Sequence, residues 1–200
     1  MKQLMNFKCS NQSSTSGAVY SDSTSSARTF VNSNIIEQNG FIEMDVDSEI
    51  GKYSIIDIAD WFLKKGNMTQ KKLQKLCYYA QAWCYALYGY RLINSDFQAW
   101  VHGPVSPVLY EKFRHFGFET IRIKGEININ LDDEDAKLLE DVWETYGDRT
   151  GNALEALTHT EEPWLEARRG YSDNERCTVV ISPDSMKRYY RRIYTGESQH

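Results

Sequence analysis

Apolar residues recur at helical spacing from residue 55 onward and divide the chain into amphipathic segments. The first segment follows Ser54, a good N-cap residue, and stops at Gly66. The second follows Thr69, ends near Gly89 and is apolar around most of its circumference. Because such a helix is usually buried on all sides, the pattern predicts a helical domain built around this second segment.

Five more helices are predicted farther along the chain, each from an apolar stripe or a helix-start signal. Proline suits the first turn of a helix, where its missing N–H would be unpaired anyway, and it stands at the start of the last two. The five segments lie around residues 108–116, 136–146, 152–157, 163–165 and 182–193. The sequence therefore predicts about seven helices.

Two stretches favour β-structure. Residues 97–101 predict a short strand, and Gly103 and Pro104 force a turn after it. Residues 121–129 alternate apolar and polar positions about Gly125, which predicts a β-hairpin. The expected fold class is mainly α: a compact bundle of about seven helices with a small antiparallel β-hairpin or sheet.

The first part of the chain has a different composition. Nearly half of residues 10–34 are Ser or Thr, and no apolar periodicity offsets the entropy of ordering them. Acidic residues at 43, 45, 47 and 49 then precede the first periodic segment. We predict a disordered Ser/Thr-rich tail over residues 1–52 and a helical domain over residues 53–196. The sequence leaves open whether the tail is a start-site artefact, a regulatory arm or a partner-binding peptide.

Charge argues against nucleic acid as a partner, and the lack of a long apolar run argues against a membrane. The net charge is −5 and no Lys/Arg-rich run is present, so the sequence lacks a strong nucleic-acid signal. The four basic residues at 187, 188, 191 and 192 are typical of a solvated helix end. No apolar run approaches the roughly 18 residues of a membrane helix, and no secretory signal is evident. We expect a cytoplasmic protein with no membrane partner.

The cysteines and the acidic residues suggest no metal or cofactor. Four cysteines at 9, 77, 84 and 177 form no CxxC and have no histidine at ligand spacing. Cys77 and Cys84 would lie about 10 Å apart on one helix, beyond disulfide reach, so we expect reduced, buried thiols. Acids at 132–135 resemble a cation or catalytic cluster, but acids just before a helix more often stabilise its dipole.

An enzymatic function has little support in the sequence. No GxGxxG, Walker, GxSxG or HExxH motif is present. The best candidates for catalysis are His102 and His159, each beside a turn, with Cys77 or Cys84 as nucleophile. We favour a structural role in which each imidazole locks a loop by bonding to an exposed carbonyl. The prediction is that the protein is not an enzyme and has no catalytic residue.

An ordered set of motifs resembles the Panacea antitoxin domain family, which includes phage-associated GepA-like proteins and SocA-like proteins. The motifs are Leu73-Gln-Lys-Leu76 with Tyr78-Tyr79-Ala80, Ala99-Trp100-Val101-His102-Gly103-Pro104-Val105 with Tyr110, Tyr146-Gly147, Leu157-Thr158-His159, Pro163-Trp164 with Ala167-Arg168, and residues 181–190. Through this resemblance the family-motif residues are Leu73, Lys75, Leu76, Tyr79, Trp100, His102, Gly103, Pro104, Tyr110, Thr158, His159, Pro163 and Trp164.

The resemblance implies an antitoxin of a two-gene toxin–antitoxin system that neutralises a cognate toxin by direct protein binding. For some members it also implies an adaptor that delivers the toxin to a protease, such as an AAA+ protease complex. No catalytic activity and no cofactor are implied. Toxins of the family vary widely, so the resemblance does not name this one. Residues 1–52 show no helix-turn-helix pattern, unlike members with a DNA-binding module.

Tyr, Trp and Arg dominate many protein interfaces, so we expect such residues on the second helix and just after it to contact the toxin. The candidate exposed contacts are Tyr79, Trp83, Tyr85, Tyr88 and Arg91. An acidic chain would suit a basic toxin. The alternatives are a nucleic-acid-binding regulator, which would need Arg168 to join the basic residues at 187–192, and a His-dependent enzyme.

Overall fold

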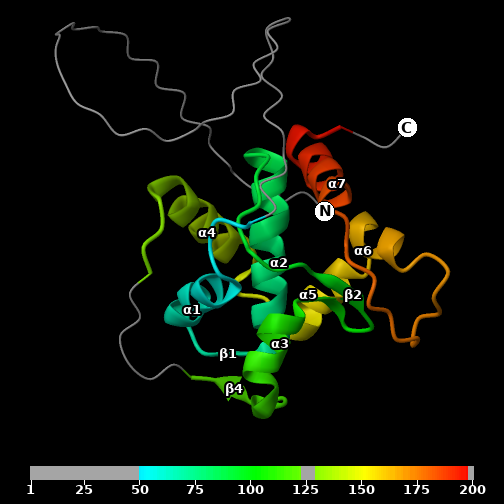
Figure 1. The fold of residues 1–200 in the computed structure, drawn as a ribbon, viewed down its shortest axis with the longest axis horizontal. Coiled ribbons are helices and arrows are strands. Elements are labelled where there is room, and N and C mark those ends of the chain that lie inside the picture. Colours follow the sequence, from blue (N-terminus) through cyan, green and yellow to red (C-terminus); the bar gives the residue numbers. More distant parts are fainter. Residues whose placement is uncertain (1–49, 123–128, 198–200) are drawn as a thin grey trace, which may run out of the picture. The chain divides into compact units, whose positions relative to one another are not determined.

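A computed structural model of the chain describes residues 50–122 and 129–197, all within one compact unit, Asp45–His200. Over these ranges the chain forms seven α-helices, and a 3₁₀ turn (Arg114–Phe116) extends the third (Figure 1). They are α1 (Ile55–Lys65), α2 (Gln70–Leu87), α3 (Pro107–Phe113), α4 (Asp133–Tyr146), α5 (Gly151–Thr158), α6 (Glu162–Ala167) and α7 (Pro183–Thr195). The predicted mainly helical fold is confirmed. Most of the predicted tail lies outside the described residues, so its disorder stays a prediction.

Helix starts follow local capping chemistry. Ser54 Oγ accepts hydrogen bonds from the amides of Ile56 and Asp57, and Thr69 caps α2 by accepting from the amide of Lys72. Ser182 caps α7 in the same way. These side chains satisfy amides that the first turn of a helix leaves unpaired. The residues named from sequence as the starts of α1, α2 and α7 therefore position these helices.

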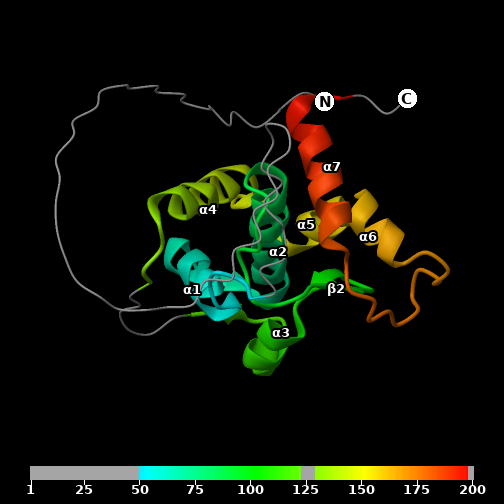
Figure 2. The ribbon, with the colours of Figure 1, turned by 45° about the horizontal axis from the view of Figure 1, so that its top comes forward.

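Helix α2 runs through the middle of the bundle and packs against α1, α4, α5 and α7 (Figures 1 and 2). It is buried on nearly all sides, as its apolar circumference predicts. Leu73 and Leu76 are fully buried core residues, and so are Cys77 and Cys84. No helix among the described residues is long and apolar enough to cross a membrane.

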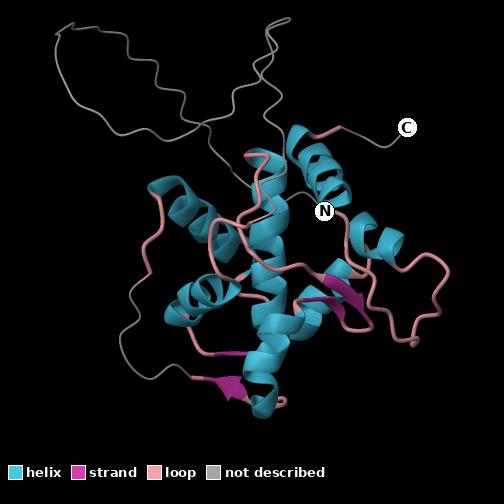
Figure 3. Cartoon of the chain, viewed as in Figure 1, coloured by secondary structure: helices cyan, strands magenta, loops and turns pink. Residues whose placement is uncertain are grey.

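Two small antiparallel sheets lie against the helices (Figure 3). Strands β2 (Gln98–Trp100) and β3 (Gly103–Val105) form a tight hairpin, and Gln98 also pairs with Val180. Strand β1 (Met68–Thr69) pairs with β4 (Thr120–Ile121). The hairpin predicted over residues 121–129 lies mostly outside the described residues, and its first residue pairs with Met68.

One of the four acids at the start of α4 has a role beyond the helix dipole. Asp135 is fully buried and accepts hydrogen bonds from the hydroxyls of Tyr53 and Tyr90 and from the ammonium group of Lys52. Gly51 packs so tightly that an added Cβ would lie 2.2 Å from the amide nitrogen of Asn94. Asp135 therefore fastens residues 51–53 and the loop after α2 to α4.

Candidate functional site

Eight of the family-motif residues meet at the β2–β3 turn, although they come from distant parts of the sequence. Helix α2 supplies one, the hairpin four, and the region from the end of α5 to α6 three. We call them the turn cluster: Lys75, Trp100, His102, Gly103, Pro104, Thr158, His159 and Trp164.

Lys75 lies inside the turn cluster with 1% of its surface exposed. Its ammonium nitrogen donates to the carbonyl oxygen of Pro104 at 3.0 Å and forms no ion pair with any carboxylate in the described ranges. Burial lowers the pKa of Lys75 to about 7, because a charge is costly away from water. The side chain thus holds the hairpin by a single carbonyl contact and can lose its charge near neutral pH.

Gly103 permits this close approach of helix and turn. Its φ of +91° is rarely adopted by other residues. An added Cβ would lie 2.6 Å from Cε of Lys75 and 2.8 Å from Oγ1 of Thr158. Both conformation and space require glycine where α2, the end of α5 and the turn meet.

His102 and Glu155 tie the tip of the turn to α5. The Nδ1 atom of His102 lies 2.8 Å from Oε1 of Glu155, and Lys71 of α2 binds the same carboxylate at 2.5 Å. Partial burial alone would raise the pKa of Glu155, but hydrogen bonds from Lys71 and His102 lower it. The histidine side chain is 71% exposed, so the tip is both fixed and accessible.

His159 and Trp164 fasten the opposite side of the turn. Their rings stack with centroids 4.1 Å apart, and Nε1 of Trp164 donates to the carbonyl of Trp100 at 3.0 Å. Burial lowers the pKa of His159, which favours the neutral ring. The predicted carbonyl partners are therefore wrong for both histidines: His102 meets a carboxylate, whereas His159 stacks on a ring.

A second buried group lies one helical turn along α2 from Lys75. The hydroxyls of Tyr79 and Tyr190 donate to the carboxylate of Glu161 at 3.2 and 2.7 Å, and burial raises the pKa of Glu161 to about 7. Tyr79 stacks on Tyr146, whose hydroxyl accepts a hydrogen bond from Trp83. We call these five residues the tyrosine cluster. The sequence did not reveal the role of Glu161, because an acidic residue just before the helix start at Pro163 is usually exposed to solvent.

A family model described as "Antitoxin SocA-like, Panacea domain" matches residues 73–165. Residues 73–165, slightly less than half of the chain, are therefore similar to the Panacea domain of SocA-like antitoxins. The match runs from Leu73 in α2 to Leu165 in α6, so it contains the whole turn cluster and Tyr79, Tyr146 and Glu161. No curated protein and no solved structure matched the chain.

Two further motif residues lie beside these clusters. Pro163 is buried at the start of α6. Tyr110 packs edge-on against Trp100, with ring centroids 5.0 Å apart, and is 40% exposed. Trp100 and Tyr110 together form a partly exposed aromatic pair beside the turn.

The prediction that Tyr79, Trp83 and Tyr85 are exposed is wrong, since each is 5% exposed or less. Neighbouring helices cover α2 nearly all round, as expected for a helix that is apolar around most of its circumference, so these three rings are buried. Tyr88 and Arg91, at the end of α2 and just after it, are half-buried. A role for these five residues in toxin binding stays a prediction, but three of them are inaccessible in this conformation.

The alternative functions find limited support in the described residues. Burial raises the pKa of the thiols of Cys77 and Cys84, and Cys84 donates to the Tyr90 carbonyl, so neither resembles an activated nucleophile. No cluster of metal ligands occurs over the described ranges. Arg168, required by the nucleic-acid alternative, is buried and bonds to carbonyls, including that of Ala99. Two of the basic residues of α7 form ion pairs with acids of α6.

Proposed function

We propose that the chain is the antitoxin of a toxin–antitoxin system and neutralises a cognate toxin by binding it directly. The observation that carries the proposal is the turn cluster. Within the matched Panacea segment, eight motif residues fix one exposed hairpin turn through hydrogen bonds and ring contacts. A rigid turn suits protein recognition, because little conformational freedom is lost on binding.

The face beside the turn carries residues suited to an interface. Paired residues of an antiparallel ladder project on the same side, and so do residues two apart on one strand. Gln98 pairs with Val180 and lies two residues before Trp100, so Val180 and Trp100 share a face. Val180 is 44% exposed, and Tyr110 extends the surface from α3. We define this hairpin face as Trp100, His102, Tyr110 and Val180.

Direct binding is tested by expressing the product of each neighbouring gene with and without this chain. We expect one small neighbour to stop growth, the chain to restore it, and the purified proteins to form a complex. Tyr110→Ala should weaken the complex at least about tenfold, because interface aromatics often contribute more than 1.4 kcal/mol. Tyr171→Ala, at a similarly exposed tyrosine outside the face, is the matched control. The absence of any toxic neighbour would contradict the proposal.

Delivery of the toxin to a protease is a finer part of the proposal and is supported only by the resemblance of the domain to adaptor-like antitoxins. Its measurement is the half-life of the toxin in cells with and without the chain. A toxin that is neutralised but not degraded would leave direct masking as the whole mechanism.

One observation favours a second candidate, a histidine-dependent enzyme: His102 and Glu155 form a histidine–carboxylate pair at the surface. Such a pair can orient an imidazole as a general base. However, Glu155 also binds Lys71, and the hydroxyl of nearby Thr158 donates to the Glu155 carbonyl. Turnover of a small molecule that His102→Ala abolishes, in protein with unchanged circular dichroism, would establish the enzyme instead.

A further inference from the structure

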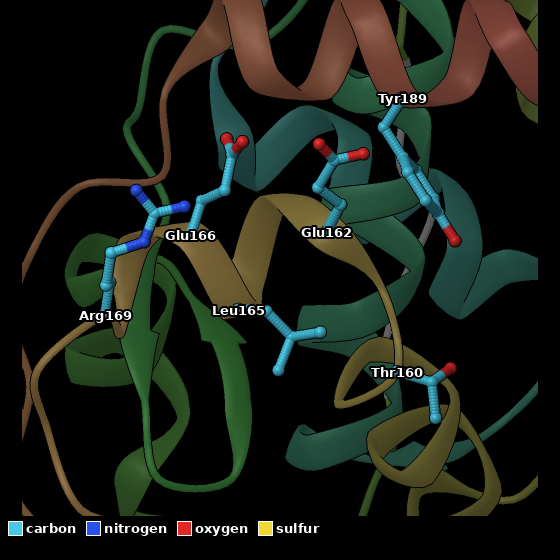
Figure 4. Close-up of a pocket in the computed structure, with 6 residues that line it drawn as sticks. All are labelled: Thr160, Glu162, Leu165, Glu166, Arg169 and Tyr189. Carbon is cyan, nitrogen blue, oxygen red and sulfur yellow. The ribbon is translucent and has the colours of Figure 1, made fainter. Parts of the chain in front are cut away.

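An open pocket of about 530 Å³ lies between α6 and α7 (Figure 4). Its lining residues are Thr160, Glu162, Leu165, Glu166, Arg169 and Tyr189. Leu165 is 49% exposed and gives the pocket an apolar wall. The volume falls in the range of sites that bind small molecules or single side chains.

The two carboxylates of the pocket are already neutralised. Glu166 accepts hydrogen bonds from Ser185 and from Arg188, and these bonds keep its pKa below the ordinary value. Glu162 forms an ion pair with Arg192. Because both carboxylates already pair with arginines of α7, the pocket offers no free acid to a cationic group of a partner.

Arg169 gives the pocket an available positive charge. Its guanidinium group forms no ion pair with any carboxylate in residues 50–122 and 129–197. Figure 4 shows it at one end of the pocket, with Tyr189 at the other end and Leu165 between them on the side away from α7. Burial raises the pKa of Tyr189 to about 12, so its hydroxyl remains a hydrogen-bond donor.

We propose that this pocket binds a peptide segment of the toxin in which an acidic residue adjoins an aliphatic one. The carboxylate forms a bidentate pair with Arg169, and the aliphatic side chain covers Leu165 and the ring of Tyr189. One unpaired guanidinium beside two carboxylates matches a monoanion better than a phosphate dianion. The occupant's identity rests on the proposed antitoxin function, whereas the ligand chemistry comes from the pocket alone.

The test uses the full chain and two probe peptides, acetyl-Leu-Glu-Leu-amide and its Gln counterpart. We expect the Glu peptide to shift the NMR signals of Arg169 Nε–H and the Leu165 methyl groups in a saturable way. Arg169→Gln should weaken binding of the Glu peptide at least about tenfold. Arg176→Gln, at an exposed arginine outside the pocket, should leave binding unchanged, and circular dichroism should confirm that each variant folds.

Equal binding of both peptides, no saturable shift with either, or shifts with inorganic phosphate alone would overturn the proposal. Once a toxin is found by neutralisation, Arg169→Gln should weaken that complex as well. Neutralisation unaffected by Arg169→Gln would refute the pocket assignment and leave the antitoxin function intact. Selective binding of the Glu peptide, with no toxic neighbour found, would support the pocket assignment and refute the antitoxin function.

Discussion

The turn cluster and the tyrosine cluster both bury an ionisable residue in the interior, but they satisfy it differently. Lys75 donates to a backbone carbonyl, whereas Glu161 accepts from two tyrosine hydroxyls. Burial lowers the pKa of the lysine and raises that of the glutamate, each to about 7. Burial thus shifts a base and an acid in neighbouring parts of one helix bundle toward their neutral forms, and the stabilities of the two clusters depend on pH in opposite ways.

The largest effect should follow from Gly103→Ala. A methyl group at that position meets both Lys75 and Thr158, and the backbone adopts a φ that alanine avoids. Overpacking and strain together should cost about 3–5 kcal/mol, enough to leave a large fraction unfolded. Chemical denaturation measures this loss. A loss below 1 kcal/mol would show that the turn cluster is loosely packed.

The pH dependence of stability distinguishes the two clusters directly. Between pH 4.5 and about 7 the folded chain keeps the proton on Glu161 that the unfolded chain releases, so stability falls as pH rises. Between about 7 and 10.5 the unfolded chain keeps the proton on Lys75 that the folded chain releases, so stability rises. At about 1.36 kcal/mol per pKa unit, the contribution is at most about 3 kcal/mol for Glu161 and at most about 5 kcal/mol for Lys75.

Glu161→Gln should remove the fall in stability below pH 7, and Lys75→Met should remove the rise in stability above pH 7. Both are measured by chemical denaturation from pH 5 to 10. If Lys75→Met instead removes the fall in stability below pH 7, the assignment of that fall to Glu161 is wrong.

Tyr190→Phe should have an intermediate effect. It removes the 2.7 Å hydrogen bond to Glu161 and leaves the carboxyl group with only Tyr79 as a donor among the described residues. The expected loss is about 1–3 kcal/mol, and the fall in stability with pH should extend to higher pH because the pKa of Glu161 rises further. Tyr171→Phe, at an exposed tyrosine outside the tyrosine cluster, is the control. Equal losses in both variants would contradict the role of Glu161.

The smallest effect on stability should come from His102→Ala. The ring is mostly exposed, so losing its bond to Glu155 should cost less than about 1 kcal/mol. Toxin binding should decrease more than stability, because His102 lies on the hairpin face. The comparison of thermal melting with complex affinity tests this. A large loss of stability in His102→Ala would show that His102 has a structural role instead.

Local chemistry made much of the fold predictable. Ser54, Thr69 and Ser182 mark helix starts because a cap depends on residues within one turn. Glu161 and Asp135 were not predictable in their roles, since their tyrosine partners Tyr79 and Tyr53 each lie 82 residues away in the sequence. The motif residues of the turn cluster were named from a resemblance, but only the three-dimensional structure shows that eight of them meet.

The anchoring of residues 51–53 has a practical consequence for anyone who shortens this chain. A version that begins at Tyr53 would leave Asp135 without the ammonium group of Lys52, and a buried carboxylate deprived of its counterion is costly. Tags and cleavage sites are better placed before Ile50, where they add to the chain without removing a partner of α4.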